Sequence, residues 1–153
     1  MAQMAAAISS EPTQDDLTMA TLAHALSILG FIAPLVIFLV KRQSRFVSFH
    51  ALQALLWQIA YFILIMVAMV GWLVMMFFMV AQTAVNKGAA PPVGIFVLFP
   101  LFWLLLMGGG ICNLIFAIVY SIKASRGEWA NYPIFGRLAR KFLKMGPTGA
   151  GMV

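Results

Sequence analysis

The chain has few charged residues. Lysine, arginine, aspartate and glutamate together make up 9% of its 153 residues, whereas hydrophobic residues make up 63% and the mean hydropathy is +0.99. A soluble domain usually carries about 25% charged residues. This deficit argues against a soluble domain and predicts an integral membrane protein.

Cysteines and acids are also scarce, with one cysteine and four acidic residues. A single cysteine excludes an intrachain disulfide, and the position of Cys112 in an apolar run indicates a small packing residue. No Asp or Glu lies within the spans predicted below, and a proton-coupled transporter normally needs a buried ionisable residue there. The sequence therefore argues against a pump.

What the chain does have is an excess of basic residues, with a net charge of +6 and an isoelectric point near 10.0. These residues lie beside apolar segments, so we interpret them as determinants of orientation and contacts with anionic lipid, and not as a nucleic-acid surface. The expected partners are the bilayer, with anionic lipid at its cytoplasmic face, and other membrane proteins or a second copy of the chain. No nucleic-acid partner is expected.

Three charge-free apolar segments predict an all-α protein with three transmembrane helices, at about residues 22–40, 54–80 and 93–122. The first segment would measure about 29 Å as a helix, close to the hydrocarbon thickness of about 30 Å. Pro34 is expected to kink it. Residues 46–53 are predicted to begin the second helix at the membrane interface.

These spans form one predicted membrane domain, residues 14–145, with a mobile segment at 1–13 and a flexible tail at 146–153. Thr13 and Asp16 fit a capping box at the start of the first helix.

Residues 134–145 predict a short basic amphipathic helix that lies in the headgroup plane. Its basic side chains are expected to contact anionic lipid: Arg137, Arg140, Lys141 and Lys144.

Lysine and arginine orient this three-span arrangement. Three of them lie between residues 41 and 45 and six lie between 123 and 144, so three spans place nine of the ten on one side. Basic residues accumulate on the cytoplasmic side. We therefore expect a multi-pass protein of a bacterial cytoplasmic (inner) membrane, with its N-terminus outside and its C-terminus in the cytoplasm. A two- or four-span arrangement would divide the basic segments between the two sides.

A polar face begins the second span. At 100° per residue, five side chains fall within about 140° of one another: His50, Gln53, Trp57, Gln58 and Tyr61. Polar groups in lipid need partners, so this face should point into the helix bundle or toward the headgroups. Interhelical hydrogen bonding with interfacial anchoring is favoured over a polar pathway or a recognition site for a partner helix. Asn113 and Ser27 are the expected partners of the glutamines.

Small residues mark the third span. Gly108 and Cys112 form a small-xxx-small pair, and Gly109 lies between them. Close helix packing within the chain is the favoured interpretation, and a homodimer seam is the alternative.

The two histidines are expected to lie far apart. His24 falls near the outer end of the first predicted span and His50 near the inner end of the second, so about 30 Å should separate them. We therefore expect no metal site and no cofactor. A Ser–His–acid triad is disfavoured for the same reason, because Glu128 is the only acid on the side of His50. With no catalytic residues identified, the chain is not expected to be an enzyme.

Two separated motifs resemble those of a family of small bacterial membrane proteins of unknown function. Residues 46–54, FVSFHALQA, resemble FVxFHAxQA, and residues 123–133, KASRGEWANYP, resemble KAxxGExxxYP. The resemblance covers roughly residues 22–140. Ser48 stands where the family often has an acid and Leu52 where it often has a lysine, so an ionic contact there is not carried over.

That family is distantly similar to the twenty-kilodalton subunit of the chloroplast inner-envelope protein-import (Tic) complex, and it includes some magnetosome membrane proteins that influence crystal growth. The motif residues are expected to make interhelical or interfacial contacts: Phe46, Phe49, His50, Gln53, Gly127, Glu128, Tyr132 and Pro133. Both motifs fall on the same side of the membrane, so we expect His50 and Gln53 to form hydrogen bonds with the 127–133 turn.

The predicted function is that of a non-enzymatic structural or interaction subunit in a larger membrane assembly. The alternative is an oligomeric channel or a translocation component similar to the chloroplast import subunit. A channel would require oligomerisation, because three mostly apolar helices cannot line an aqueous pore alone.

Overall fold

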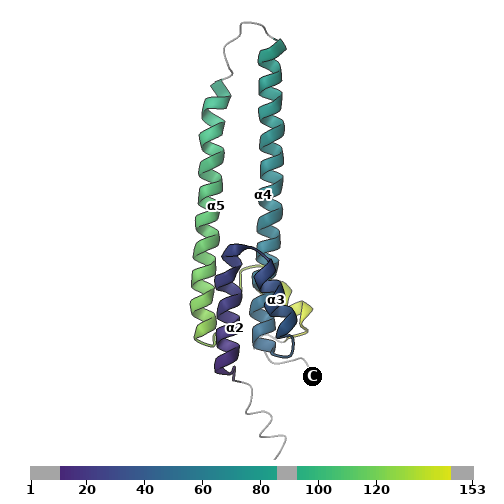
Figure 1. Cartoon of the computed structure of the whole chain (residues 1–153), viewed down its shortest axis with the longest axis vertical. Helices are drawn as coiled ribbons and strands as arrows, with labels where there is room; N and C mark the ends of the chain where they lie inside the picture. The colour runs from purple at the N-terminus through teal and green to yellow at the C-terminus, as the bar shows by residue number, and fades with distance from the viewer. Residues whose placement is uncertain (1–10, 86–92, 146–153) are drawn as a thin grey trace, which may run out of the picture. The chain divides into compact units, whose positions relative to one another are not determined.

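A computed structural model describes residues 11–85 and 93–145, and within these ranges the regular elements are all helical. They are, in order, α2 (Gln14–Ala25), the 3-10 helix η1 (Leu26–Leu29), α3 (Ile32–Val40), α4 (Arg45–Val85), α5 (Val93–Ser125) and α6 (Phe135–Phe142) (Figure 1). The expected all-α class is confirmed. The predicted mobile segment, except for its last three residues, and the predicted flexible tail lie outside the described residues.

The predicted first span is wrong as a single helix. The chain breaks at Gly30, whose φ of 115° and ψ of −166° are accessible essentially only to glycine. Pro34 causes no kink, because it stands in the first turn of α3, where proline is tolerated. With 12 and 9 residues, α2 and α3 measure about 18 and 14 Å, so neither helix can cross the hydrocarbon core.

Two helices, not three, are long and apolar enough to cross a membrane among the described residues: Arg45–Val85 and Phe96–Ser125. The inference that a two-span chain would divide the basic segments is also wrong. If α4 and α5 are the two crossing helices, the segments before α4 and after α5 still share one side of the membrane.

The chain forms two compact units. One contains Met1–Ile59 with Leu114–Val153, and the other contains Ala60–Asn113. We call them the polar unit and the hairpin unit. Because α4 and α5 each contribute to both, a single helix can be buried by protein along one stretch and exposed along another.

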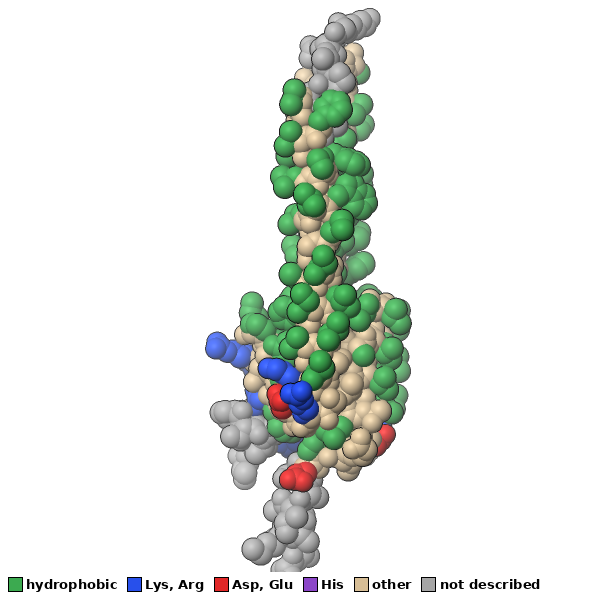
Figure 2. All heavy atoms as spheres, turned by 90° about the vertical axis from the view of Figure 1, so that its left-hand side faces the viewer, with side chains coloured by type: hydrophobic (Ala, Val, Ile, Leu, Met, Phe, Trp, Pro, Cys, Tyr) green, Lys and Arg blue, Asp and Glu red, His purple; other side chains and the backbone are tan. Residues whose placement is uncertain are grey.

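The hairpin unit contains two antiparallel helical stretches that pack through aromatic rings. Trp72 stacks on Phe102 with ring centroids 4.6 Å apart, and a Cβ atom added at Gly109 would lie 3.8 Å from the Tyr61 ring. Most of its other large side chains are exposed, as in Phe77 at 77%. On the face drawn in Figure 2, hydrophobic side chains cover this unit, and the charged side chains that are coloured belong to the polar unit.

The polar unit has a protein-like core. The first turns of α4 are buried from Phe46 to Leu55, and Phe49, Leu52 and Leu55 form a cluster with Ala139 and Met145. Helix α6 therefore turns one face toward α4, and its expected position in the headgroup plane stays a prediction. The predicted helix end at residue 145 is also late, because α6 ends at Phe142 and Lys144 adopts a φ of 50°.

Local sequence signals fix the ends of two helices in this unit. Thr13 and Asp16 form the predicted capping box at the start of α2. Gly127, with a φ of 75°, closes α5: its amide donates to the Ala124 carbonyl, and the Glu128 amide donates to the Lys123 carbonyl. This pair of bonds is a Schellman motif, which directs the chain back toward α4.

Candidate functional site

Four buried polar side chains meet inside the polar unit. His24 comes from α2, His50 and Gln53 come from α4, and Tyr132 comes from the segment between α5 and α6. None is more than 1% exposed. We call these four residues the polar network.

His50 and Gln53 bind the segment that follows α5. His50 Nε2 lies 3.1 Å from the Glu128 carbonyl oxygen, and Gln53 Nε2 donates to the Ala130 carbonyl at 2.9 Å. Gln53 Oε1 accepts from the Tyr132 amide at 3.1 Å. The hydrogen bonds expected between these two side chains and the 127–133 turn are therefore present. Ser27 is not among these partners of Gln53; its hydroxyl donates to the His24 carbonyl.

The expected separation of the two histidines is wrong. His24 Nε2 lies 2.9 Å from His50 Nδ1, because the break at Gly30 keeps α2 beside the start of α4. The distance argument against a metal site therefore fails. Among the described residues, however, no group of three His, Cys, Asp or Glu side chains is placed to hold a metal ion.

The proton positions in the polar network follow from the one partner that can only accept. The Glu128 carbonyl requires a proton on His50 Nε2, so in the neutral ring Nδ1 is an acceptor. His24 Nε2 then donates to His50 Nδ1, and His24 Nδ1 accepts from the Tyr132 hydroxyl at 3.1 Å. The three side chains thus form a hydrogen-bonded chain with one direction, from Tyr132 to the Glu128 carbonyl.

Burial keeps His24 and Tyr132 uncharged. Desolvation, with a smaller contribution from His50, lowers the pKa of His24 well below its ordinary value of 6.5. Desolvation also raises the pKa of the Tyr132 hydroxyl above its ordinary value. The neutral forms that the hydrogen bonds require are therefore the forms that burial favours.

Aromatic rings surround the polar network. The ring centroids of Tyr120 and Tyr132 lie 4.0 Å apart, and those of Phe46 and His50 lie 4.6 Å apart. Trp129 packs edge-on against Phe46, and Phe49 belongs to the hydrophobic cluster beside it. Of the remaining motif residues, Gly127 makes the turn, Glu128 contributes its carbonyl, and Pro133 is exposed.

Sequence reasoning missed His24 as a member of this site. The signal available was Gly30, since a glycine six residues after a histidine in an apolar segment is compatible with a chain reversal. Tyr120 was missed as well, because a tyrosine near the end of an apolar helix is equally typical of an interfacial anchor.

The residues of the predicted polar face of α4 fall in both units. In the polar unit, Trp57 stacks on Phe116 at 4.7 Å and Gln58 is buried. In the hairpin unit, Tyr61 lies beside Gly109, and Asn113 is 9% exposed.

The small residues of α5 differ in whether they contact another helix. Gly109 faces Tyr61, so close packing within the chain holds at this position. A Cβ atom at Gly108 would meet nothing within 4 Å, and Cys112 is exposed.

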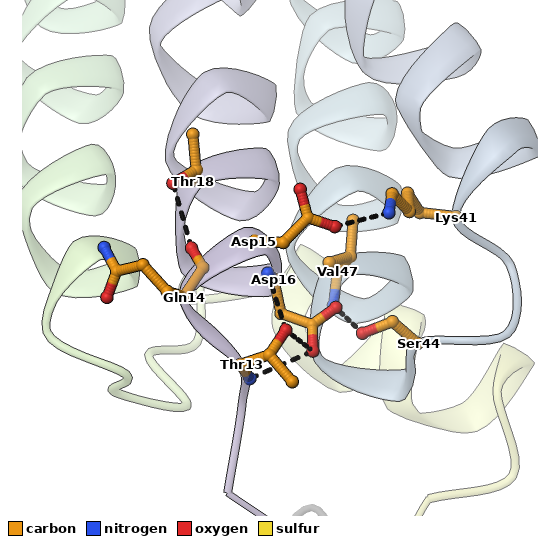
Figure 3. Close-up of polar contacts among 8 residues, drawn as sticks. All are labelled: Thr13, Gln14, Asp15, Asp16, Thr18, Lys41, Ser44 and Val47. Carbon is orange, nitrogen blue, oxygen red and sulfur yellow. Dashed lines mark hydrogen bonds and ion pairs between the residues drawn. The ribbon is translucent and has the colours of Figure 1, made fainter.

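A second set of polar contacts fastens the start of α2 to the turn before α4 (Figure 3). Asp15 forms an ion pair with Lys41, which raises the pKa of that lysine. Partial burial raises the pKa of Asp16, but hydrogen bonds from Ser44 and Thr13 and the charge of Lys41 outweigh it and lower the pKa. Both ends of α2 are therefore attached to α4 or its preceding turn.

The four basic residues expected to contact lipid have different surroundings. Arg140 donates from Nε to Asn131 Oδ1 at 2.8 Å, and its guanidinium carbon lies 4.9 Å from the centroid of the Phe49 ring. Arg137, Lys141 and Lys144 are exposed. Arg140 is therefore held by the protein, whereas the other three extend from the surface of α6 and the turn after it.

The polar network and the contacts at the start of α2 hold α2 against α4 and the turn before it. The three-span prediction from hydropathy had instead placed His24 and His50 near opposite surfaces of the membrane. All buried side-chain nitrogen and oxygen atoms of the described residues have a hydrogen-bond partner. What this arrangement can do is hold α2, α4 and the 128–132 segment in one geometry.

The sequence matches a known family. Residues 15–139 match the magnetosome magnetite crystal formation protein family, and this range includes all four residues of the polar network. No curated protein and no solved structure matches the chain. The family match supports the magnetosome part of the resemblance, and the similarity to the chloroplast import subunit stays a prediction.

Proposed function

The chain belongs to the magnetosome magnetite crystal formation protein family, and from this premise we propose that it is a structural protein of the magnetosome membrane. In this proposal it contributes to magnetite crystal formation without catalysing a reaction. The hairpin unit anchors it in lipid, and the polar unit presents a fixed surface to other components of the assembly.

The observation that carries this proposal is the closed polar network. His24, His50, Gln53 and Tyr132 bond to one another and to backbone groups, and burial keeps them away from any substrate in solution. Buried polar groups with all partners in place rigidify a unit and specify its geometry. Such an arrangement favours a scaffold over a reaction site.

The proposed membrane segment is the hairpin unit. Residues 60–85 of α4 and 93–113 of α5 would measure about 39 and 31 Å, enough to cross a core of about 30 Å. Nine of the ten basic residues lie before α4 or after α5, or at the ends of these helices that border those segments. By the positive-inside rule, the polar unit would therefore lie at the cytoplasmic face, with both flanking segments on that side and in contact with anionic lipid.

The test is replacement of the chromosomal gene in a magnetosome-forming host by a Gln53→Ala variant, with Gln82→Ala as the matched control. Gln53 is buried in the polar unit, whereas Gln82 is exposed on the hairpin unit. We expect Gln53→Ala to change the size or number of magnetite crystals in electron micrographs, and Gln82→Ala to leave both as in the parent. Membrane fractionation checks that both proteins still reach the membrane. Normal crystals in a strain lacking the gene would refute the proposal.

An oligomeric channel, or a translocation component, is the second candidate. The feature that favours it is the open face of α5, where Gly108 is uncovered and Cys112 is exposed. Because Cys112 is the only cysteine, oxidation of native membranes would link two copies only if these faces meet. A disulfide-linked dimer together with a conductance in planar bilayers would favour this candidate. A monomer without conductance would dismiss it.

A further inference from the structure

Helix α6 has an inner face held by the protein and an outer face that is not. Gly136 and Ala139 are buried, and a Cβ atom at Gly136 would lie 2.6 Å from the Asn131 Cβ, so the helix approaches the preceding segment closely. On the outer face, Ile134 just before the helix is 71% exposed and Phe142 is 67% exposed. The outer face therefore offers uncovered apolar side chains among basic ones.

Two neighbouring grooves lie along this outer face. The first has a volume of about 370 Å³ and is lined by Asn131, Tyr132, Pro133, Arg137 and Arg140. The second has a volume of about 330 Å³ and is lined by Pro133, Ile134, Arg137, Leu138 and Lys141. Pro133 and Arg137 belong to both, so the grooves adjoin at the Arg137 side chain.

The two grooves differ in chemistry. Two arginines and an asparagine line the first, which suits an anion with several oxygen acceptors. Isoleucine, leucine and proline line the second, and Lys141 stands beside them. No carboxylate lines either groove, so an anion would meet no acidic side chain there.

The two arginines of the first groove differ in how firmly the protein holds their guanidinium groups. The bond from Arg140 Nε to Asn131 Oδ1 and its contact with the Phe49 ring fix the guanidinium in place. Arg137 is exposed, and within the described part of the chain its side chain makes no ion pair or hydrogen bond. One fixed and one adjustable guanidinium can close on a phosphate from two sides.

We propose that these grooves hold a single acidic phospholipid, with its phosphate between Arg137 and Arg140 and part of an acyl chain along Ile134 and Leu138. The proposal rests on the membrane location proposed above and adds a defined lipid site to it. A free phosphate would use the first groove only, so the apolar second groove is the reason for choosing a lipid as the occupant.

The test is retention of phosphatidylglycerol by the full-length chain in native mass spectrometry, after extraction from nanodiscs of mixed phosphatidylglycerol and phosphatidylcholine. We compare the double variant Arg137→Gln/Lys141→Gln with the control Lys123→Gln/Arg126→Gln, which loses the same charge outside both grooves. Neither Arg137 nor Lys141 makes a side-chain contact that the fold needs in the described structure. We expect the groove variant to bind phosphatidylglycerol about tenfold more weakly and the control to remain within about twofold of the parent. Equal losses in both variants would show delocalised attraction and overturn the site.

A competition experiment separates a lipid from a free phosphate. Phosphatidylglycerol should displace bound fluorescent phosphatidylglycerol at far lower concentration than glycerophosphoglycerol, which has the same headgroup without acyl chains. Leu138→Gln should remove most of that preference. Equal potency of the two competitors would identify a phosphate site and overturn the lipid proposal. Incorporation of the chain into nanodiscs is scored separately, so that failure of membrane insertion, which would contradict the proposed function, is distinguished from failure of lipid selectivity.

Discussion

The polar unit and the hairpin unit distribute their polar and apolar side chains in opposite ways. In the polar unit the polar side chains are inside, where His24, His50 and Gln53 bond to one another and to a turn. In the hairpin unit the apolar side chains are outside, and the contacts between its two helices are mainly aromatic. The first unit is therefore organised like a small soluble domain and the second like a protein surface in lipid.

This difference shows what hydropathy misses. Residues 22–40 are as apolar as a membrane span, yet they fold into short helices that pack in the polar unit. Two residues decide this outcome: Gly30 permits the chain reversal, and His24 gains a buried partner only when the reversal occurs. Composition over a window cannot reveal either effect.

The largest difference in stability between the two units is expected for Gln53→Ala. This change removes hydrogen bonds to the Ala130 carbonyl, the Tyr132 amide and His50, and it leaves those groups buried. Since each unsatisfied buried group costs about 1–3 kcal/mol, we expect a loss of about 3 kcal/mol in the opening free energy of the polar unit. Hydrogen exchange of the 128–132 amides measures it. Gln82→Ala in the hairpin unit should change stability by less than about 0.5 kcal/mol, and equal effects would contradict the account.

A glycine-to-alanine substitution should destabilise the polar unit but not the hairpin unit. Gly30→Ala places a side chain at a backbone conformation that only glycine tolerates, and we expect a cost of about 2 kcal/mol. Gly71 lies inside α4 with nothing within 4 Å of an added Cβ atom, so Gly71→Ala should be neutral or stabilise by about 0.5 kcal/mol. Thermal unfolding in detergent compares them. Tolerance of alanine at residue 30 would show that the chain reversal does not depend on its glycine.

The polar unit should lose stability in mild acid, whereas the hairpin unit should not. The pKa of His24 is lowered well below 6.5 in the folded state, so below about pH 6.5 the unfolded chain takes up a proton that the folded chain does not. His24 therefore lowers the free energy of unfolding as the pH falls from 6.5 toward its folded pKa, by about 1.4 kcal/mol per pH unit. Both histidines of the chain lie in the polar unit. Hydrogen exchange at pH 7 and pH 5.5, corrected for intrinsic rates, should show this loss in the polar unit alone.

Tyrosine-to-phenylalanine changes should give the smallest difference. Tyr132→Phe deprives the buried His24 Nδ1 of its donor, and we expect a cost of about 1 kcal/mol. Tyr61 makes no hydroxyl hydrogen bond within the described part of the hairpin unit, so Tyr61→Phe should have almost no effect. Chemical unfolding followed by tryptophan fluorescence compares the two variants. A Tyr132→Phe variant as stable as the parent would contradict the proposed bond from the Tyr132 hydroxyl to His24.

Local signals in the sequence predicted several parts of this structure. The Thr13–Asp16 capping box, the turn at Gly127 and the bonds from His50 and Gln53 to the turn that follows it were all expected from residue type and spacing. These features depend on neighbouring residues or on two motifs placed on one side of a membrane.

The rest depended on long-range contacts that spacing does not encode. The pairing of His24 with His50, and the packing of α6 against α4 through Ala139, required the packed arrangement of four segments. The three-span arrangement placed the histidines on opposite sides of the membrane and could not bring them together. The wrong prediction of a single span at residues 22–40 therefore also caused His24 to be missed as a member of the polar network.

The most direct test of the account is the side of the membrane on which each flank of the α4–α5 pair lies. In a Cys112→Ala background, Glu11→Cys reports on the segment before α2 and Arg126→Cys on the segment after α5, since both positions are exposed. A membrane-impermeant maleimide is applied to sealed vesicles of known orientation. If residues 14–40 fold back as α2 and α3 and only α4 and α5 cross, both cysteines react in the same inside-out vesicles and are protected in right-side-out vesicles. Labelling from opposite sides would mean that residues 22–40 cross the membrane and would contradict the fold on which the polar network depends.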